Sequence, residues 1–187
     1  MSTDETFNPW RVLGSRAVYE NPWISVREDE VVRPDGNPGI YGVVHYKNVA
    51  VGVLPVEDGH VYLVGQYRYP LGRYSWEIPE GGCPAHEDPL QAARRELKEE
   101  TGLDAANWEK LGEADLSNSV ADERAVLYLA TGLVPGEQEP DGTEVLGVRR
   151  VPLDEAISMA LDGRMRDAIS QLALLGYAMK RTGGSAL

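Results

Sequence analysis

The stretch 81–103, GGCPAHEDPLQAARRELKEETGL, carries the clearest structural signal in this sequence of 187 residues. Asp88 is a favoured N-cap residue, and Pro89 suits the first position of a helix because its missing N–H would have no partner there. Gly102 can end a helix in the left-handed conformation that other residues avoid. Together these signals predict a helix over 89–101.

Three carboxylates of this helix lie on one side of it. Placed at about 100° per residue, Glu96, Glu99 and Glu100 fall within an arc of about 100°, beside the apolar positions. The apolar positions recur at helical spacing and are Leu90, Ala93 and Leu97. Each carboxylate pair disfavours the helix by a few tenths of a kcal/mol. A hard divalent cation would relieve that repulsion; from the helix alone, a solvated acidic face paired with Arg95 remains the alternative.

Composition and charge exclude several other classes of protein. Thirty acidic and eighteen basic residues give a net charge of −12, which disfavours nucleic acid and anionic membranes as partners. No apolar run reaches the roughly 20 residues that cross a bilayer, and the first residues lack a signal-peptide pattern, so we expect a cytoplasmic protein. Cys83 has no second cysteine for a disulfide, and the three histidines show no zinc-site spacing.

The first half of the chain has the pattern of strands. Three β-branched and aromatic runs, 40–46, 49–55 and 60–67, are separated by turn residues and predict an antiparallel meander. Before them, 17–32 contains alternating stretches that predict a smaller two-stranded piece. This piece would end at the turn sequence RPDG, residues 33–36.

The second half mixes strands with helices. We expect strands at 124–130 and 145–151, and amphipathic helices at 153–161 and 165–180. The last helix would bury Ile169, Leu172, Leu175 and Met179 on its apolar side. An α/β fold follows from this order of elements.

The organisation along the chain predicts three parts. We expect an N-terminal β appendage over 1–39, one main domain over 40–181, and a disordered tail over 182–187. The length allows one full core, with a small addition, but not two independent domains.

The central stretch matches a known signature. Gly81 is followed after five residues by Glu87, and after seven more by 95–103, RELKEETGL. This pattern resembles the signature of the Nudix hydrolases at every fixed position. The resemblance implies an α/β/α sandwich around a mixed sheet, and an enzyme that hydrolyses the diphosphate of a nucleotide derivative.

The resemblance also implies a metal site. Glu96 and Glu100 match direct ligands of Mg²⁺ or Mn²⁺, Glu99 a further ligand or water-holding group, and Glu80 a ligand through its backbone carbonyl. Roughly two or three ions would offset the diphosphate charge and lower the pKa of an attacking water. Three further signature positions have structural roles by the same resemblance: Gly81, Glu87 and Arg95.

The flanking sequence is similar to one branch of this family, the ADP-ribose pyrophosphatases. The segment 66–82 contains Arg68 and Glu77, which match a phosphate contact and a substrate contact of that branch. Its N-terminal appendage implies a homodimer that completes the substrate pocket. Trp23 and Arg27 on the appendage are then candidates for base stacking and phosphate binding.

The general base is expected on a late loop. Glu144 is the best match to the branch and Glu139 the second, with Glu99 as a third candidate. Many ADP-ribose enzymes have a proline beyond the signature where this chain has 118–123, NSVADE. Other substrates therefore remain alternatives to ADP-ribose: GDP-mannose, a dinucleoside polyphosphate or a modified nucleoside triphosphate. A non-catalytic module that senses a nucleotide is the alternative to an enzyme.

Overall fold

The computed structural model describes residues 7–138 and 146–182. Its chain divides into two compact units, and we describe each by itself. The first combines Met1–Asn48 with Asp115–Glu123, and the second combines Val49–Ala114 with Arg124–Leu187. Among the described residues, no helix is long and apolar enough to cross a membrane.

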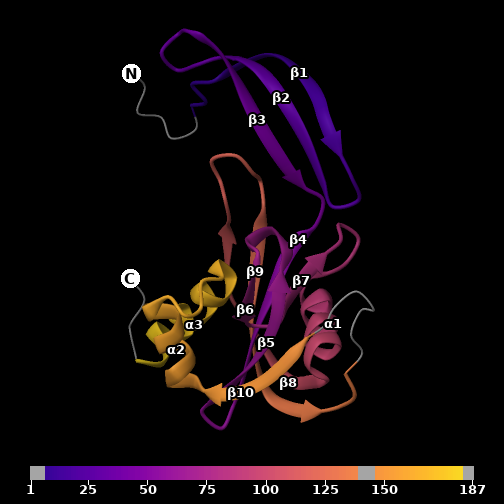
Figure 1. The fold of residues 1–187 in the computed structure, drawn as a ribbon, viewed down its shortest axis with the longest axis vertical. Helices are drawn as coiled ribbons and strands as arrows, with labels where there is room; N and C mark the ends of the chain where they lie inside the picture. The colour runs from indigo at the N-terminus through magenta and orange to yellow at the C-terminus, as the bar shows by residue number, and fades with distance from the viewer. Residues whose placement is uncertain (1–6, 139–145, 183–187) are drawn as a thin grey trace. The chain divides into compact units, whose positions relative to one another are not determined.

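The first unit contains a three-stranded antiparallel sheet (Figure 1). Its strands are β1 (Arg11–Glu20), β2 (Ile24–Val32) and β3 (Pro38–Tyr46), in that order. The prediction that 40–46 opens the meander is therefore wrong. The turn at 33–36 is the reason, because it joins β2 to β3 as a hairpin in unbroken register from Ile24↔Tyr46 to Val32↔Pro38.

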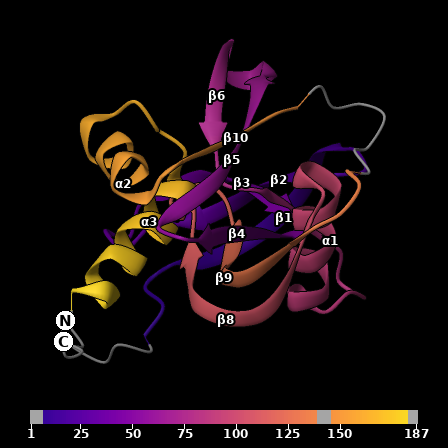
Figure 2. The same cartoon turned by 90° about the horizontal axis from the view of Figure 1, so that it is seen from below.

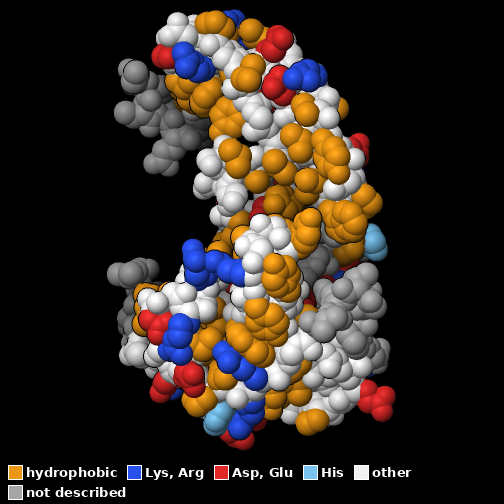
Figure 3. Space-filling model, in the orientation of Figure 1, with side chains coloured by type: hydrophobic (Ala, Val, Ile, Leu, Met, Phe, Trp, Pro, Cys, Tyr) orange, Lys and Arg blue, Asp and Glu red, His pale blue; other side chains and the backbone are white. Residues whose placement is uncertain are grey.

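This small sheet buries little apolar surface within its own unit. Of its described hydrophobic residues, Val31 alone falls in the buried class. Hydrophobic side chains reach the surface over the sheet (Figure 3), and the large exposed ones include Val12, Leu13, Val18, Tyr19, Trp23, Ile40 and Tyr46. A sheet of three strands needs a covered apolar face to be stable by itself.

The second unit is built on a seven-stranded mixed sheet. The strand order is β10-β5-β4-β9-β8, with β6 paired to β5 and β7 paired to β4. The bounds are β4 Val49–Glu57, β5 His60–Arg68, β6 Arg73–Glu77, β7 Glu80–Cys83, β8 Leu103–Asp115, β9 Arg124–Pro135 and β10 Gly147–Pro152, with a short 3-10 turn at Tyr69–Leu71. β4 runs parallel to β9 and antiparallel to β5. The mixed sheet that we predicted is confirmed.

Helices cover both faces of this sheet. Figure 2 shows α1 (Pro89–Thr101) on one side, and α2 (Leu153–Asp162) and α3 (Ala168–Arg181) on the other. The predicted α/β/α arrangement is therefore confirmed. On the α1 side of the sheet, Val51 and Val53 of β4 belong to the same core cluster as Ala93 and Leu97 of α1. All four side chains are fully buried.

The buried face of α3 differs from the predicted one. Ile169 is buried as predicted, but Leu172 and Met179 are 47% and 64% exposed, and the other buried residues are Ser170, Ala173 and Leu174. Ile169 makes the close contact with the sheet: a Cβ built on Gly52 of β4 would lie 2.4 Å from Ile169 Cγ2. The small residue at this contact is therefore Gly52 of the strand, which leaves room for Ile169 of the helix.

The start of α3 is also later than expected. The predicted helix began at residue 165, whereas α3 begins at Ala168 because Asp167 caps it. Met165 is instead a fully buried residue of the preceding connection. At the other end, Thr182 is the C-cap of α3, and 183–187, for which we predicted disorder, lie outside the described residues.

Candidate functional site

The ends of α1 are fixed by the capping residues that the sequence indicates. Asp88 Oδ1 accepts hydrogen bonds from the N–H groups of Leu90 (3.0 Å) and Gln91 (3.3 Å). Gly102 has φ 71° and donates its N–H to the carbonyl of Lys98 at 2.8 Å. These caps hold both helix ends, so the glutamates between them have a defined position on the sheet.

The signature glutamates of α1 lie beside the core. Glu96 and Glu100 are only 9% and 2% exposed, and the side chain of Glu99 is 33% exposed. Gly81 of β7 lies directly against Glu96, since a Cβ at that position would stand 2.1 Å from the carboxylate carbon. The glycine therefore allows a carboxylate to rest against the backbone of β7.

Arg95 forms hydrogen bonds with three carboxylates of the signature. It donates to Glu87 Oε2 (3.1 Å), Glu96 Oε1 (2.7 Å) and Glu99 Oε2 (3.0 Å), and to the carbonyl of Gly82 at 2.9 Å. The hydrogen bond to Glu87, helped by Glu96 and Glu99, raises the pKa of Arg95 despite its partial burial. The guanidinium thus stays charged and offsets part of the repulsion among these acids.

Arg68, at the end of β5, contacts a second group of acids. Its Nη2 donates to Glu77 Oε2 at 2.6 Å and also to Glu80 Oε1. The side chains of Glu77 and Glu80 are 2% and 10% exposed. Burial alone would lower the pKa of Arg68, but the bond to Glu77 and the charge of Glu80 raise it.

Glu80 connects this second group to α1. Its backbone N–H donates to Glu100 Oε2 at 2.9 Å. Its Oε2 is buried and has no hydrogen-bond partner within the described part of the chain. Burial, and then the charge of Asp167, raise the pKa of Glu80 well above its ordinary value, although Arg68 opposes this.

Asp167 belongs to this group and was missed by the sequence reasoning. It caps α3 by accepting a hydrogen bond from the N–H of Ser170 at 2.7 Å. One possible ligand oxygen from each of Glu77, Glu80 and Asp167 lies within 4.8 Å of the others. An aspartate before the apolar pattern of α3 is an N-cap signal, but nothing local indicates that it lies near β6 and β7.

The chemistry of these donors fits a hard divalent cation. All of them are carboxylate or carbonyl oxygens, which Mg²⁺ and Mn²⁺ prefer. The buried, unpartnered Glu80 Oε2 is the type of atom that a bound cation would satisfy. Glu96, Glu99 and Glu100, with the backbone of Glu80 beside Glu100, are the residues that could hold the metal.

The remaining predicted site residues are not all described. Trp23 is 68% exposed in the first unit, and Arg27 in the same unit forms an ion pair with Asp29 at 3.1 Å. Glu139 and Glu144, the two loop candidates for the general base, lie outside the described residues. Their role as a base stays a prediction.

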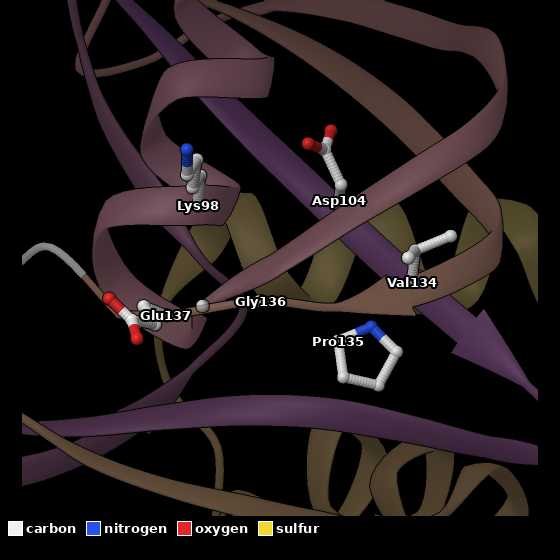
Figure 4. Close-up of a pocket in the computed structure, with 7 residues that line it drawn as sticks. Lys98, Asp104, Val134, Pro135, Gly136 and Glu137 are labelled. Carbon is white, nitrogen blue, oxygen red and sulfur yellow. The ribbon is translucent and has the colours of Figure 1, made fainter.

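A pocket of about 320 Å³ lies at the C-terminal end of α1. Figure 4 shows Lys98 reaching it from the helix, Asp104 from β8, and Val134 to Glu137 from the end of β9 and the segment that follows. None of the predicted site residues that the structure describes lines this pocket. The candidate site is therefore the carboxylate region between α1, β7 and the start of α3.

The chain matches two known domains. The NUDIX domain matches residues 46–172, and the nucleoside diphosphate sugar hydrolase N-terminal domain matches residues 10–44. A solved structure of an ADP compounds hydrolase has a TM-score of 0.82 at 24% identity and covers 97% of this chain and 100% of that chain. This structural likeness shows the fold.

Curated relatives cover almost the whole sequence. An ADP-ribose pyrophosphatase of Mycobacterium tuberculosis is 31% identical, over 93% of this chain and 86% of the relative. A CMP-5'-(N-acetyl-N-hydroxy-3-aminopropyl)phosphonate hydrolase of Streptomyces rubellomurinus is also 31% identical, over 92% and 85%. Because a NUDIX domain spans more than half of the sequence, and relatives of this identity extend along nearly all of it, the chain belongs to the Nudix family and is a Nudix hydrolase.

Proposed function

We propose that this enzyme hydrolyses the diphosphate bond of a nucleoside diphosphate sugar, with ADP-ribose as the substrate and AMP and ribose 5-phosphate as the products. The observation that carries the proposal is the burial of Glu96 and Glu100 against the backbone of β7, where Gly81 leaves room for a carboxylate. The relative from M. tuberculosis, which is named for ADP-ribose, supports this substrate.

In this proposal some signature residues bind the metal and others position those ligands. Glu96 and Glu100 would be direct ligands of Mg²⁺ or Mn²⁺, with Glu99 and the carbonyl of Glu80 completing the set. The metal supplies positive charge for the diphosphate and acidifies a bound water. Arg95 holds Glu96 and Glu99 in position, and its contact with Glu87 anchors it in turn.

Hydrolysis requires a general base for the attacking water and a positive group that binds the phosphate. Water adds to one phosphorus, the bridging P–O bond breaks, and the proton of the water passes to a carboxylate. We propose Glu144 as that carboxylate, with Glu139 and Glu99 as the alternatives. Arg68 would contact a phosphate oxygen, and Glu77 would contact the substrate or orient Arg68, to which it is bonded.

The N-terminal unit has a proposed role in a homodimer. Its exposed apolar side chains and the match of residues 10–44 to an N-terminal domain of sugar nucleotide hydrolases support this. In the dimer, Trp23 would stack on the base and Arg27 would bind phosphate. We expect analytical ultracentrifugation to give twice the chain mass of 20.5 kDa; a monomer at micromolar concentration would contradict this part of the proposal.

A second substrate class has a specific observation in its favour. The relative from S. rubellomurinus is as similar as the one from M. tuberculosis but is named for a CMP-linked phosphonate. GDP-mannose, dinucleoside polyphosphates and modified nucleoside triphosphates belong in the same comparison. A non-catalytic sensor is the remaining alternative, and it is disfavoured because all the signature glutamates are present.

An activity screen tests the proposal directly. The enzyme would be incubated with ADP-ribose and the other compounds, with Mg²⁺ or Mn²⁺, and the products separated by ion-exchange chromatography. We expect ADP-ribose to have the highest kcat/KM, and chelation by EDTA to abolish turnover until Mg²⁺ is added. Turnover that survives exhaustive chelation, or binding of every compound without hydrolysis, would overturn the proposal.

A further inference from the structure

The acids around Arg68 come from three separate elements. Glu77 ends β6, Glu80 begins β7, and Asp167 precedes α3. One ligand oxygen of each lies within 4.8 Å of the other two. Oxygens on opposite sides of a divalent cation are at most about 4 to 5 Å apart, since the metal–oxygen bonds are roughly 2.0 to 2.6 Å long. The three carboxylates therefore already have the spacing of ligands around one ion.

The charge of this group is not balanced by Arg68. One guanidinium faces three carboxylates, and its hydrogen bonds go to Glu77 and Glu80. Within the described residues, Glu80 Oε2 has no hydrogen-bond partner, although its side chain is only 10% exposed. A buried carboxylate oxygen without a donor is costly, and a cation at this point would remove that cost.

Asp167 can contribute a ligand without losing its structural role. It caps α3 through Oδ2, which accepts the N–H of Ser170. A carboxylate has two oxygens and about four acceptor sites, so capping and metal binding are compatible. The carboxylates of this cluster lie on β6, β7 and the residue before α3, and not on α1 with Glu96, Glu99 and Glu100, although the N–H of Glu80 bonds to Glu100.

We propose that Glu77, Glu80 and Asp167 form a divalent-cation site of their own, in which the bound cation takes the place of the Arg68 guanidinium. The displaced guanidinium then turns towards the anionic substrate, so that metal loading and diphosphate binding reinforce each other. This role for Arg68 rests on the proposed function, whereas the cation site itself does not.

The substitution Asp167→Asn tests the site without removing the cap. Asparagine is as good an N-cap as aspartate, so α3 keeps its first hydrogen bond while the ligand charge is lost. Mn²⁺ binding to the full chain, without nucleotide, would be followed by electron paramagnetic resonance of the free ion. We expect one class of Mn²⁺ sites to weaken by about 10- to 100-fold, or to disappear, because a charged ligand is missing.

Asp88→Asn is the matched control for this experiment. Asp88 caps α1 through the same kind of hydrogen bond, but it is not part of the cluster. We expect its Mn²⁺ titration to equal that of the wild type, and thermal unfolding to confirm that both variants are folded. If Asp167→Asn binds Mn²⁺ with unchanged number and affinity of sites, the cation site is refuted.

A separate experiment tests whether the bound cation takes the place of the Arg68 guanidinium. Arg68→Gln removes the competing positive charge, so the same class of sites should bind Mn²⁺ about tenfold more tightly or better. Arg73→Gln makes an equal change in net charge on the strand position paired with Arg68, and we expect a smaller effect from it. Equal effects of the two substitutions would refute the exchange.

The two proposals fail in different ways. The Mn²⁺ titrations contain no nucleotide, so an enzyme that does not hydrolyse ADP-ribose can still show the loss caused by Asp167→Asn. Conversely, an active enzyme whose Asp167→Asn variant keeps all its Mn²⁺ sites would retain the proposed function and refute this cation site.

Discussion

Arg68 and Arg95, both in the second unit, form the same kind of ion pair in different surroundings. Arg95 forms hydrogen bonds with three acids of one short segment, Glu87, Glu96 and Glu99, whose side chains are 22%, 12% and 33% exposed. Arg68 forms hydrogen bonds with Glu77 and Glu80, whose side chains are 2% and 10% exposed, and Glu80 Oε2 has no partner among the described residues.

The difference in burial sets what each group can do. The pairs of Arg95 with Glu87 and Glu99 are partly exposed, so they gain little energy but also cost little desolvation. Buried charges are expensive unless each one is fully paired. The Arg68 group is therefore the one whose stability should respond strongly to a cation.

Glu100 lies between the two groups and should give the largest functional effect. Glu100→Gln keeps the shape of the side chain and the acceptor for the N–H of Glu80, but it removes the charge of a proposed metal ligand. We expect kcat to fall by roughly 10²- to 10⁴-fold, with weaker metal binding and little change in unfolding temperature. Steady-state kinetics over a range of Mg²⁺ concentrations measures both.

Glu144→Gln separates a ligand from a base. A general base outside the metal site should lower kcat by about 10²-fold or more while metal affinity and KM stay nearly unchanged. Glu139→Gln and Glu99→Gln, measured at saturating metal, are the comparisons. If Glu144→Gln keeps more than about a tenth of the wild-type kcat, the base is one of the other two or no protein group at all.

The next effect concerns stability and compares the two arginines directly. Arg68→Gln leaves the buried carboxylates of Glu77 and Glu80 without the guanidinium that pairs with them, and should destabilise the metal-free protein by about 3 to 5 kcal/mol. Arg95→Gln should cost only about 1 to 2 kcal/mol, because two of its three acids, Glu87 and Glu99, are 22% and 33% exposed and solvent screens them. Urea unfolding in EDTA measures both, and Mg²⁺ should restore more stability to Arg68→Gln. Equal losses would remove the distinction between the groups.

A smaller effect is expected from crowding the Glu96 carboxylate. In Gly81→Ala the new Cβ would overlap this carboxylate, which must rotate away from β7. We expect Mn²⁺ affinity to fall by about tenfold, the lower end of effects on groups that position ligands. Gly112→Ala is the control, because a Cβ there meets nothing within 4 Å. If both variants bind Mn²⁺ like the wild type, Glu96 does not depend on Gly81 for its position.

The same comparison explains what could be predicted from the sequence. The Arg95 group lies within 81–103, where helix caps and helical spacing fix every position, so the arc of glutamates beside the core could be inferred. The Arg68 group is assembled by strand pairing and by the packing of α3. Asp167 has no local feature beyond its N-cap position that indicates Glu80 as a neighbour.

The errors in the fold have a similar cause. Residues 40–46 have the pattern of a strand, but which neighbour they pair with depends on the hairpin at 33–36 and not on their own composition. In α3, Ile169 is buried as predicted, but Ala173 and Leu174 are buried in place of Leu172 and Met179, because tertiary packing and not spacing alone decides which side of the helix faces the sheet. β8 was not predicted, since 103–115 is too polar to show a clear alternation.

Asp122, an exposed carboxylate in the first unit, should contribute less to stability than the acids bound to Arg68 and Arg95. Asp122 accepts hydrogen bonds from His45 Nδ1 (2.6 Å) and from the N–H of Tyr46 (3.0 Å), and its side chain is 48% exposed. Burial acts to raise the pKa of Asp122, but these hydrogen bonds outweigh it and lower the pKa below the usual 3.8.

Asp122→Asn should therefore have the smallest effect, and one that depends on pH. A carboxyl group whose pKa is lowered by folding contributes stability above pH 3.8 and loses that contribution as the pH falls through the lower value of the folded state. Because solvent screens this pair, we expect a loss of less than about 1 kcal/mol at pH 7, which shrinks at pH 3 and in 1 M salt. Urea unfolding at the two pH values measures it. A loss as large as that of Arg68→Gln would mean that burial does not decide the strength of these pairs, and the contrast between the two arginines would need another explanation.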